Sequence, residues 1–455
     1  MALPNPEIRH LLARTGFGMA RPEEIDALSG RSYAQAVDRL LDGVATKPFT
    51  TPPDWLNVPL FAQLEANLPK DRRDAMQMER REDGREMKAW WWAEMLNTPS
   101  PMTEHMVLFW HNHFTSALNK VSRPELMYRQ TELFRTMALG NFEKLVKASA
   151  KDPAMLVYLD TNSNKAGAPN ENFARELMEL FTLGEGRGYT EQDVREAARA
   201  FTGWRVVTGN TSATGWRVDG LQHDGGSKKF MGRTGRFDGD DIIDIILQQP
   251  QVAEFVTEKL WHDLVSDPAD RVEVQRLAKA FRDSKYELKP LVRAVLLSDA
   301  FRDPQNRGSL VKSPTDLIVG TFRVIGTPPA NPSLFAAAGR ALGQDLLDPP
   351  NVKGWPGGLS WIDTSLLPAR NAFMNGVAAG VEVQVTGKQT LATQARRDMK
   401  NLPVQALDAD RLKKMSALPD AEVAALLLPV APVAKINGVG GKVGALLLDP
   451  TYNLK

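Results

Sequence analysis

The chain has 455 residues, 43% of them hydrophobic and 24% charged, the balance of an ordinary soluble globular protein with a large core. Its 56 lysines and arginines nearly cancel its 55 aspartates and glutamates, so the net charge of +1 gives no general electrostatic reason to bind nucleic acid or an anionic membrane. The absence of cysteine excludes disulfides, thiolate catalysis and cysteine-ligated metal centres.

The N-terminal region has no basic leader followed by an apolar run. No stretch approaches the ~18 uninterrupted apolar residues of a membrane span. We therefore expect a cytoplasmic protein without a membrane span. A periplasmic protein, exported with a partner or with a leader missing from this chain, is the alternative.

Apolar residues recur at three- and four-residue spacing along most of the chain, which predicts a mainly α-helical, bundle-like fold. Residues 71–96 combine a dense mixed-charge run with three adjacent tryptophans, and the charges suit a solvated helix. Residues 44–56 contain three prolines and are predicted to form a loop. Residues 343–365 are irregular and rich in Gly, Pro and Trp, so this segment is expected to pack over another part of the protein.

A polar and aromatic stretch, EHMVLFWHNHF, occupies residues 104–114 and is predicted to begin as a helix. Glu104 and His111 share one stripe of that helix. His111 and His113 are separated by roughly 200° on a helix, so they can bind one metal ion only if the helix has ended by Trp110 and an extended segment follows. The alternative is a hydrogen-bonded pair of core histidines.

Residues 170–204 are predicted to form two helices joined by a glycine-rich turn. Asn170 is a favourable N-cap for the first helix, and Glu171 suits its first turn. Thr190 and Asp193 resemble a capping box at the start of the second helix. One polar face of the first helix carries Asn172, Arg175, Glu176 and Glu179.

This polar face has two interpretations. It is either a solvated face with an Arg175–Glu179 ion pair, or a carboxylate cluster turned towards His111. In the second case Glu176 and the imidazoles suit a divalent metal ion such as Mn, Fe or Zn, or general acid–base catalysis.

Residues 205–232 change character, with short alternation and many glycines, which predicts a small β-hairpin inserted in the helical protein. Within this stretch His223 is followed by Asp224 and two glycines. Asp224 either orients His223 in a functional loop or caps a turn.

Eight strings of the chain together resemble one family, the bacterial domain of unknown function 1800. They are HLLARTGFG, FWHNHF, KDPAMLVYLD, NENFARELMELFTLGEGRGYTEQDVREAARAFTGW, HDGGSKKFMG, FDGDDIIDIIL, KSPTDLIVG and PPNVKGWPGG. The resemblance implies a mostly helical module, often encoded beside a protein of the domain of unknown function 1501 family, which resembles phosphatase and sulfatase-type hydrolases. We place the main module at residues 1–375 and a C-terminal extension of short helices, packed on it, at residues 376–455.

Two functional hypotheses follow. The first is a metal-assisted hydrolase or oxidoreductase whose site lies between the segments 104–114 and 170–204. Its ligands, acid–base groups and pocket walls would be His111, His113, Glu176, Glu104, Glu171, His223, Asp224, Trp110, Asn170, Asn172, Arg175, Glu179 and Trp204. The second is a non-catalytic partner or maturation factor of the neighbouring hydrolase-like protein, in which the same polar residues form a network that fixes the helices.

Overall fold

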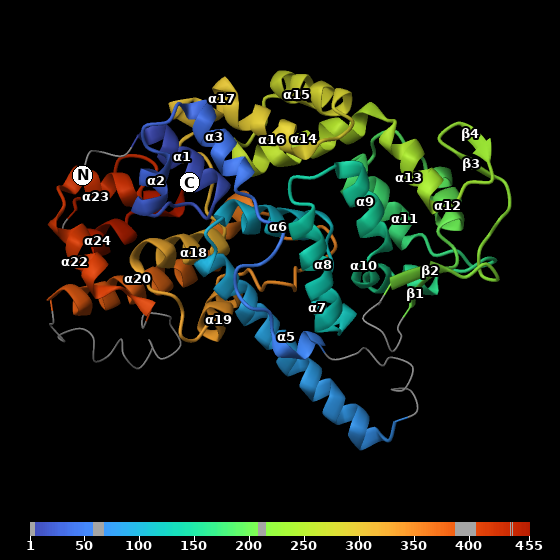
Figure 1. Ribbon diagram of the computed structural model, residues 1–455, viewed down its shortest axis with the longest axis horizontal. Coiled ribbons are helices and arrows are strands. Elements are labelled where there is room, and N and C mark those ends of the chain that lie inside the picture. The colour runs from blue at the N-terminus through green and yellow to red at the C-terminus, as the bar shows by residue number, and fades with distance from the viewer. Residues whose placement is uncertain (1–4, 58–67, 208–214, 387–405, 437, 439) are drawn as a thin grey trace.

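The computed structural model of the protein describes residues 5–57, 68–207, 215–386, 406–436, 438 and 440–455, and it confirms the mainly helical fold (Figure 1). Its buried apolar side chains form one continuous core that extends from Ile8 in the first helix to Tyr452 near the end of the chain. None of the described helices is long and apolar enough to cross a membrane.

The N-terminal half begins with three short helices and then contains the longest helix of the described chain. The elements are α1 (Pro6–Thr15), α2 (Pro22–Leu28), α3 (Tyr33–Asp42), η1 (Asp54–Asn57), α5 (Lys70–Asn97), α6 (Pro101–His113), α7 (Leu118–Val121), α8 (Pro124–Thr136), α9 (Phe142–Lys151) and α10 (Pro153–Tyr158). Proline occupies the first turn of α1, α2, α6, α8 and α10, where its missing N–H costs no helical hydrogen bond.

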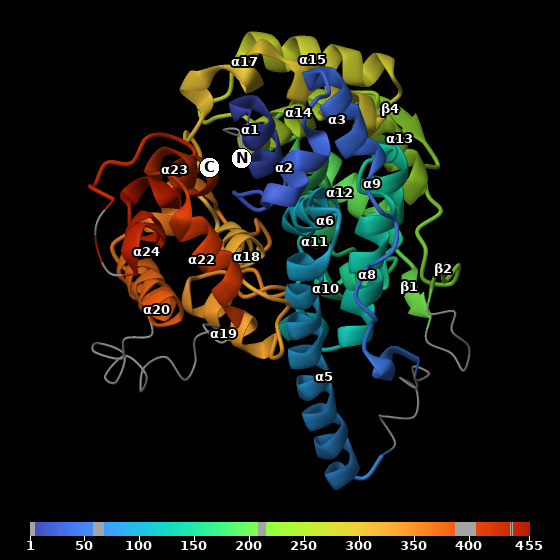
Figure 2. The same cartoon turned by 60° about the vertical axis from the view of Figure 1, so that its left-hand side comes forward.

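Helix α5 has two unlike halves. Its N-terminal half carries the mixed-charge run, is almost fully exposed and projects from the body in both views (Figures 1 and 2). From Met87 to Leu96 the helix is buried, and the three tryptophans, Trp90, Trp91 and Trp92, all lie in the core. The solvated helix predicted from the charges therefore describes only the first half of α5.

The predicted helical hairpin is present, with two local differences. It comprises α11 (Asn172–Glu176), the π-helical segment η3 (Leu177–Thr182) and α12 (Glu191–Ala200), and the short η2 (Thr161–Ser163) precedes it. The N-cap of α11 is Glu171 rather than the predicted Asn170, whose side chain instead accepts a hydrogen bond from the N–H of Asn172. The capping box of Thr190 and Asp193 is confirmed.

The predicted β-hairpin is two hairpins. Strand β1 (Trp204–Val207) pairs antiparallel with β2 (Gly215–Val218), and β3 (Lys228–Phe230) pairs antiparallel with β4 (Arg233–Gly235). Both are small two-stranded sheets, the first beside η2 and α10 and the second beside α12, so the fold class stays mainly α.

The C-terminal half is again helical, with the irregular segment between α19 and α20. Its elements are α13 (Gly239–Leu247), α14 (Pro250–Leu264), α15 (Arg271–Asp283), α16 (Leu288–Leu297), α17 (Asp299–Arg302), η4 (Pro304–Asn306), α18 (Pro314–Ile325), α19 (Ser333–Ala341), η5 (Gly358–Ile362), α20 (Leu366–Thr386), α22 (Ala409–Ala417), α23 (Asp420–Leu427), α24 (Gly441–Leu447) and η8 (Pro450–Asn453). Helix α20 continues across residue 375 and packs against α22 and α24, and a β-bridge joins Val311 to Leu454. The division at 375 stays a prediction.

Candidate functional site

A cleft of about 740 Å³ lies where α6, the C-terminal part of α14, the segment before α18 and the irregular loop 353–361 meet. Its walls combine charged groups, histidines and aromatic rings. The lining includes His105, Phe109, Asn112, His113, Lys259, His262, Asp263, Asp267, Ser313, Asp316, Gln344, Lys353, Trp355, Trp361 and Lys455.

Helix α6 determines how His111 and His113 are used. The helix continues through His113, so the extended segment required for His111 and His113 to share a metal ion is not formed. His111 is buried between the rings of Trp91 and Trp355, at centroid distances of 5.6 Å and 5.8 Å, and its Nε2 has no hydrogen-bond partner. Of the two, His113 lines the cleft.

His113 forms a pair with Lys259 of α14. The Nε2–H of His113 donates to the carbonyl of Phe181 over 3.0 Å, so Nδ1 is free to accept, and the Lys259 ammonium donates to it over 3.2 Å. Burial and the charge of Lys259 lower the pKa of His113 well below its ordinary value, which keeps the imidazole neutral. Burial also lowers the pKa of Lys259, from 10.5 to about 8.

The second partner of Lys259 is the carbonyl of Leu180, at 3.2 Å. The carbonyls of Leu180 and Phe181 belong to the last turn of η3, where helical carbonyls lack N–H partners and the helix dipole favours a cation. The two predicted segments, 104–114 and 170–204, therefore do meet. They meet through main-chain carbonyls, and the carboxylates of the second segment do not take part.

Asn112, which lies between His111 and His113, holds the irregular segment 343–365 in place. Its Oδ1 accepts the N–H of Trp355 over 2.7 Å, and its Nδ2 donates to the carbonyl of the same residue over 3.3 Å. Gly354 makes this close approach possible, since a Cβ there would lie 2.1 Å from Asn112 Oδ1. The loop is thus anchored to α6, and its Trp355 and Trp361 also form a wall of the cleft.

Most other charges in the cleft are paired with opposite charges. His105 donates from Nδ1 to the carbonyl of Gly16 over 2.8 Å and from Nε2 to Asp263 over 2.7 Å. Burial would raise the pKa of Asp263, but His105, Lys455 and Arg14 together hold it below its ordinary value. Lys455 Nζ lies 2.9 Å from Asp316.

Glu104, predicted as a catalytic group, is not part of the cleft lining. Its side chain is fully buried and paired with Arg135, with Nε–Oε1 and Nη2–Oε2 distances of 2.7 Å and 2.8 Å, and it also accepts the indole N–H of Trp91. Three of the four lone-pair directions of the carboxylate are thus used by structural partners. Trp110, predicted as a pocket wall, is fully buried and donates to the carbonyl of Ala138.

The polar face of α11 and η3 matches the solvated interpretation. Arg175 pairs with Glu171, Glu179 and Glu191 at 3.1 Å, 3.4 Å and 2.8 Å, and these side chains are partly exposed. Burial and Glu179 raise the pKa of Glu176. In the described residues no hydrogen bond or ion pair joins these carboxylates to His113, whose partners are Phe181 and Lys259.

The remaining predicted site residues lie at the other end of the hairpin. Asn172 contacts Asp160 over 3.4 Å, and Trp204 is buried against Trp216. His223 donates from Nδ1 to the carbonyl of Thr202, whereas Asp224 pairs with Arg199 over 2.7 Å. Asp224 therefore does not orient His223, and its contact with the N–H of Gly226 is the turn cap that was the alternative.

No group of three or more His, Asp or Glu side chains within the described ranges is arranged to hold a metal ion. The metal site stays a prediction without a ligand set. Lys259, His105 and Asp263 were not predicted from the sequence, because a single charged or imidazole side chain on a helix gives no signal of what it contacts.

The fold and the cleft define a mainly helical protein with a charged, aromatic-walled cleft. The chain belongs to the family of proteins of unknown function DUF1800, whose sequence model matches residues 10–453. No curated protein and no solved structure matches it. Three strings that carry the family resemblance, FWHNHF, KSPTDLIVG and PPNVKGWPGG, contribute residues to the cleft.

Proposed function

We propose that the cleft is an active site in which Lys259 exchanges a proton with a small organic anion. The observation that carries this proposal is the set of partners around Lys259: its nitrogen contacts a neutral imidazole and a carbonyl, and it lies over the ring of Phe255, 4.9 Å from the centroid. No carboxylate pairs with it among the described residues, whereas His105 and Lys455 each have one.

The Lys259 nitrogen has three positions besides its bond to carbon, and the two acceptors leave one of them for a ligand. His113 and Leu180 each take one N–H of Lys259. The remaining tetrahedral position carries either the third proton of the ammonium, which can be given to a bound base, or the lone pair of the amine, which can take a proton. A lysine whose pKa is about 8 supplies both forms near neutral pH, as acid–base catalysis requires.

The walls indicate the kind of molecule that fits. Phe109, Trp355 and Trp361 offer apolar and aromatic surface. An anionic group of the ligand would supply the negative charge that no described carboxylate supplies to Lys259. Binding energy for such a ligand comes from burial of its carbon skeleton and from one charge-assisted hydrogen bond.

The proposal predicts that Lys259 reacts as an amine at unusually low pH. In reductive methylation with formaldehyde and cyanoborohydride, followed by mass spectrometry, the neutral amine is the reactive form. Its fraction rises as the pH increases through the pKa, so modification of Lys259 is expected to reach half its maximal rate near pH 8. A lysine in a model peptide reaches it near pH ~10.4.

A panel of small carboxylates and phosphate esters then tests the ligand class at pH 8. A compound that binds in the cleft protects Lys259 and leaves the modification of Lys279, an exposed lysine of α15, unchanged. The same compound raises the melting temperature of the wild type and not of Lys259→Met. A Lys259 that titrates like the model peptide, or that no member of the panel protects, would rule the proposal out.

Metal-assisted hydrolysis or oxidation remains the sequence-based prediction. Metal analysis of the purified protein, with His111→Ala as the comparison, tests it independently of the lysine chemistry.

A second candidate function is that of a protein partner, and the projecting half of α5 favours it. Residues 70–82 stand away from the body and carry both signs of charge around Met78, whose exposed fraction is 70% (Figure 2). Such a surface suits docking to another protein, and the hydrolase-like protein of the domain of unknown function 1501 family is the partner we propose.

Co-purification of the two proteins tests this role. The double replacement Met78→Glu with Arg81→Glu is expected to abolish the complex and to leave the unfolding transition unchanged, because both positions are exposed. The replacement Lys279→Glu on α15 serves as a surface control. Absence of a complex with the wild-type protein, or a complex that survives the α5 replacements, would refute a role of this surface.

A further inference from the structure

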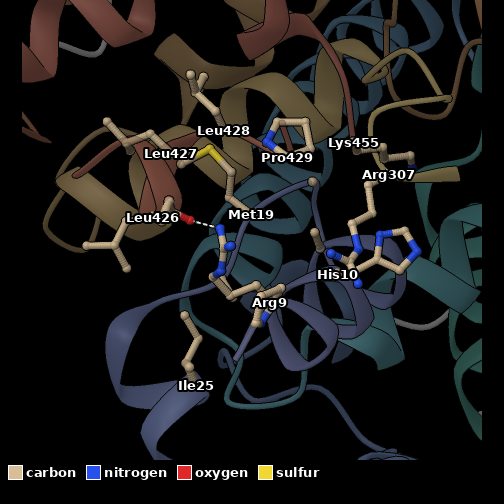
Figure 3. A pocket seen from close by; sticks show the side chains of 15 residues that line it. Arg9, His10, Met19, Ile25, Arg307, Leu426, Leu427, Leu428, Pro429 and Lys455 are labelled. Carbon is tan, nitrogen blue, oxygen red and sulfur yellow. Dashed lines mark hydrogen bonds between the residues drawn. The ribbon is translucent and has the colours of Figure 1, made fainter. Parts of the chain in front are cut away.

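A second, smaller cavity of about 40 Å³ lies at the junction between the N-terminal helices and the C-terminal part of the chain. It is bounded by α1, the turn at residues 18–20, the loop that carries Arg307, and the end of α23 with the residues that follow it. Figure 3 shows Arg9 and Arg307 entering this space from two sides, with the imidazole of His10 next to Arg307.

The cavity gathers basic side chains without a balancing acid. Arg9, His10, Arg307 and Lys455 line it, and no Asp or Glu does. The nearby carboxylates are already paired: Glu7 with Arg302 at 2.9 Å, and Asp316 with Lys455 at 2.9 Å. Two guanidinium groups thus share a small space, and no aspartate or glutamate side chain of the described residues pairs with either of them.

Both arginines also present unused donors. The Nε atoms of Arg9 and Arg307 are buried and lack a hydrogen-bond partner in the described structure. The guanidinium of Arg9 donates to the carbonyl of Ala425, which fixes its orientation, whereas the side chain of Arg307 has no hydrogen bond or ion pair there. Buried polar groups are normally satisfied, so two orphaned N–H donors that meet in one cavity indicate a missing acceptor.

The lowered pKa values of Arg9 and His10 also indicate a site that lacks a negative charge. Burial and the charge of Arg307 lower the pKa of Arg9. Burial, Arg14 and Arg307 lower the pKa of His10 to about 3, so this imidazole stays neutral, and its Nε2–H donates to the carbonyl of Phe301 over 3.0 Å. The repulsion between the two arginines is therefore the electrostatic cost that a bound anion would remove.

We propose that this cavity binds a small oxyanion, a phosphate or a carboxylate group, held between the guanidinium groups of Arg9 and Arg307. Planar guanidinium forks match both oxyanions. The opposite wall, formed by Met19, Ile25 and Leu426, is apolar and limits the ligand to a compact group. Because α1 and the residues after α23 close the cavity together, the anion also ties the C-terminal part of the chain to the first helix. The site is separate from Lys259 and does not depend on the cleft being catalytic.

Isothermal titration of the full chain with phosphate, sulfate and acetate, at constant ionic strength in chloride buffer, tests the proposal. We expect saturable binding of one equivalent of at least one of these anions, and the preferred anion distinguishes a phosphate-type from a carboxylate-type ligand. Arg307→Gln removes one charge-assisted contact and should weaken binding about tenfold or more. Arg302→Gln, an exposed arginine of the neighbouring helix α17, should bind as the wild type does.

Two further variants keep the test decisive. Ala13→Leu fills the cavity without removing a charge and should also prevent binding, so the result does not depend on the folding of Arg307→Gln. Lys259→Met should bind the anion normally, which separates this site from the cleft. Absence of saturable binding, binding that survives both Arg307→Gln and Ala13→Leu, or loss of binding in Lys259→Met would overturn the proposal.

Discussion

Replacement of Glu104 by glutamine is expected to lower the free energy of unfolding by about 3–5 kcal/mol. Glu104 and Arg135 have no exposed side-chain surface, and the carboxylate accepts three hydrogen bonds, two from Arg135 and one from Trp91. A neutral amide cannot accept from all three donors, and it leaves Glu132, which is partly exposed, as the described carboxylate still bonded to the buried guanidinium. Urea denaturation followed by tryptophan fluorescence measures the loss.

Two comparisons identify the cause of that loss. The double replacement Glu104→Leu with Arg135→Met removes both charges and should recover most of the stability, since apolar side chains of similar volume often replace a buried ion pair at little cost. Glu179→Gln breaks a partly exposed pair and should cost less than about 1 kcal/mol. A cost for Glu104→Gln as small as that for Glu179→Gln would contradict the structural role assigned to Glu104.

Glu104 also shows what the sequence can and cannot predict. Its position in the first turn of a helix that continues through a largely apolar stretch, residues 106–110, marks it as unusual, and that much is visible in the chain. Its partner Arg135 is 31 residues away on another helix, and no spacing rule connects the two. The sequence therefore indicates that Glu104 is a polar residue in an apolar setting, but whether it serves chemistry or packing depends on contacts made only in the folded protein.

Local features were more predictable than the site. The capping box at Thr190 depends on residues three apart and follows from the sequence alone. The π-helical turn η3 does not, because its free carbonyls are stabilised by His113 and Lys259 from distant helices. The site was missed for the same reason: Lys259 lies 146 residues from His113, among the ordinary charged residues of α14.

The irregular segment 343–365 is an intermediate case. Its composition predicted an ordered loop packed over another part of the protein, and the loop does pack over α6 and border the cleft. The composition did not show that the contact is made by Asn112. Asn112 lies between His111 and His113, the two predicted metal ligands, and its side-chain amide positions the loop.

Gly354→Ala is expected to be the most damaging small substitution in this loop, with a cost of about 2–5 kcal/mol. The residue has φ of +80°, where a side chain costs about 1–2 kcal/mol. The added Cβ would in addition lie 2.1 Å from Asn112 Oδ1 and 2.8 Å from its carbonyl, and overpacking of this kind costs about 1–3 kcal/mol. Relief of the clash requires the loop to move away from α6, which breaks the hydrogen bonds between Asn112 and Trp355.

Gly357→Ala is the matched control, because Gly357 has φ of +72° and a Cβ there meets nothing within 4 Å. It should cost only the backbone strain of about 1–3 kcal/mol, since φ of +72° with ψ of −171° is a conformation that residues other than glycine rarely adopt. The two alanine variants also differ in their effect on the cleft. Displacement of Trp355 opens the wall beside His113, so Lys259 should be methylated faster in Gly354→Ala than in Gly357→Ala at pH 8. Equal unfolding free energies and equal labelling rates in the two variants would show that Asn112 does not hold the loop.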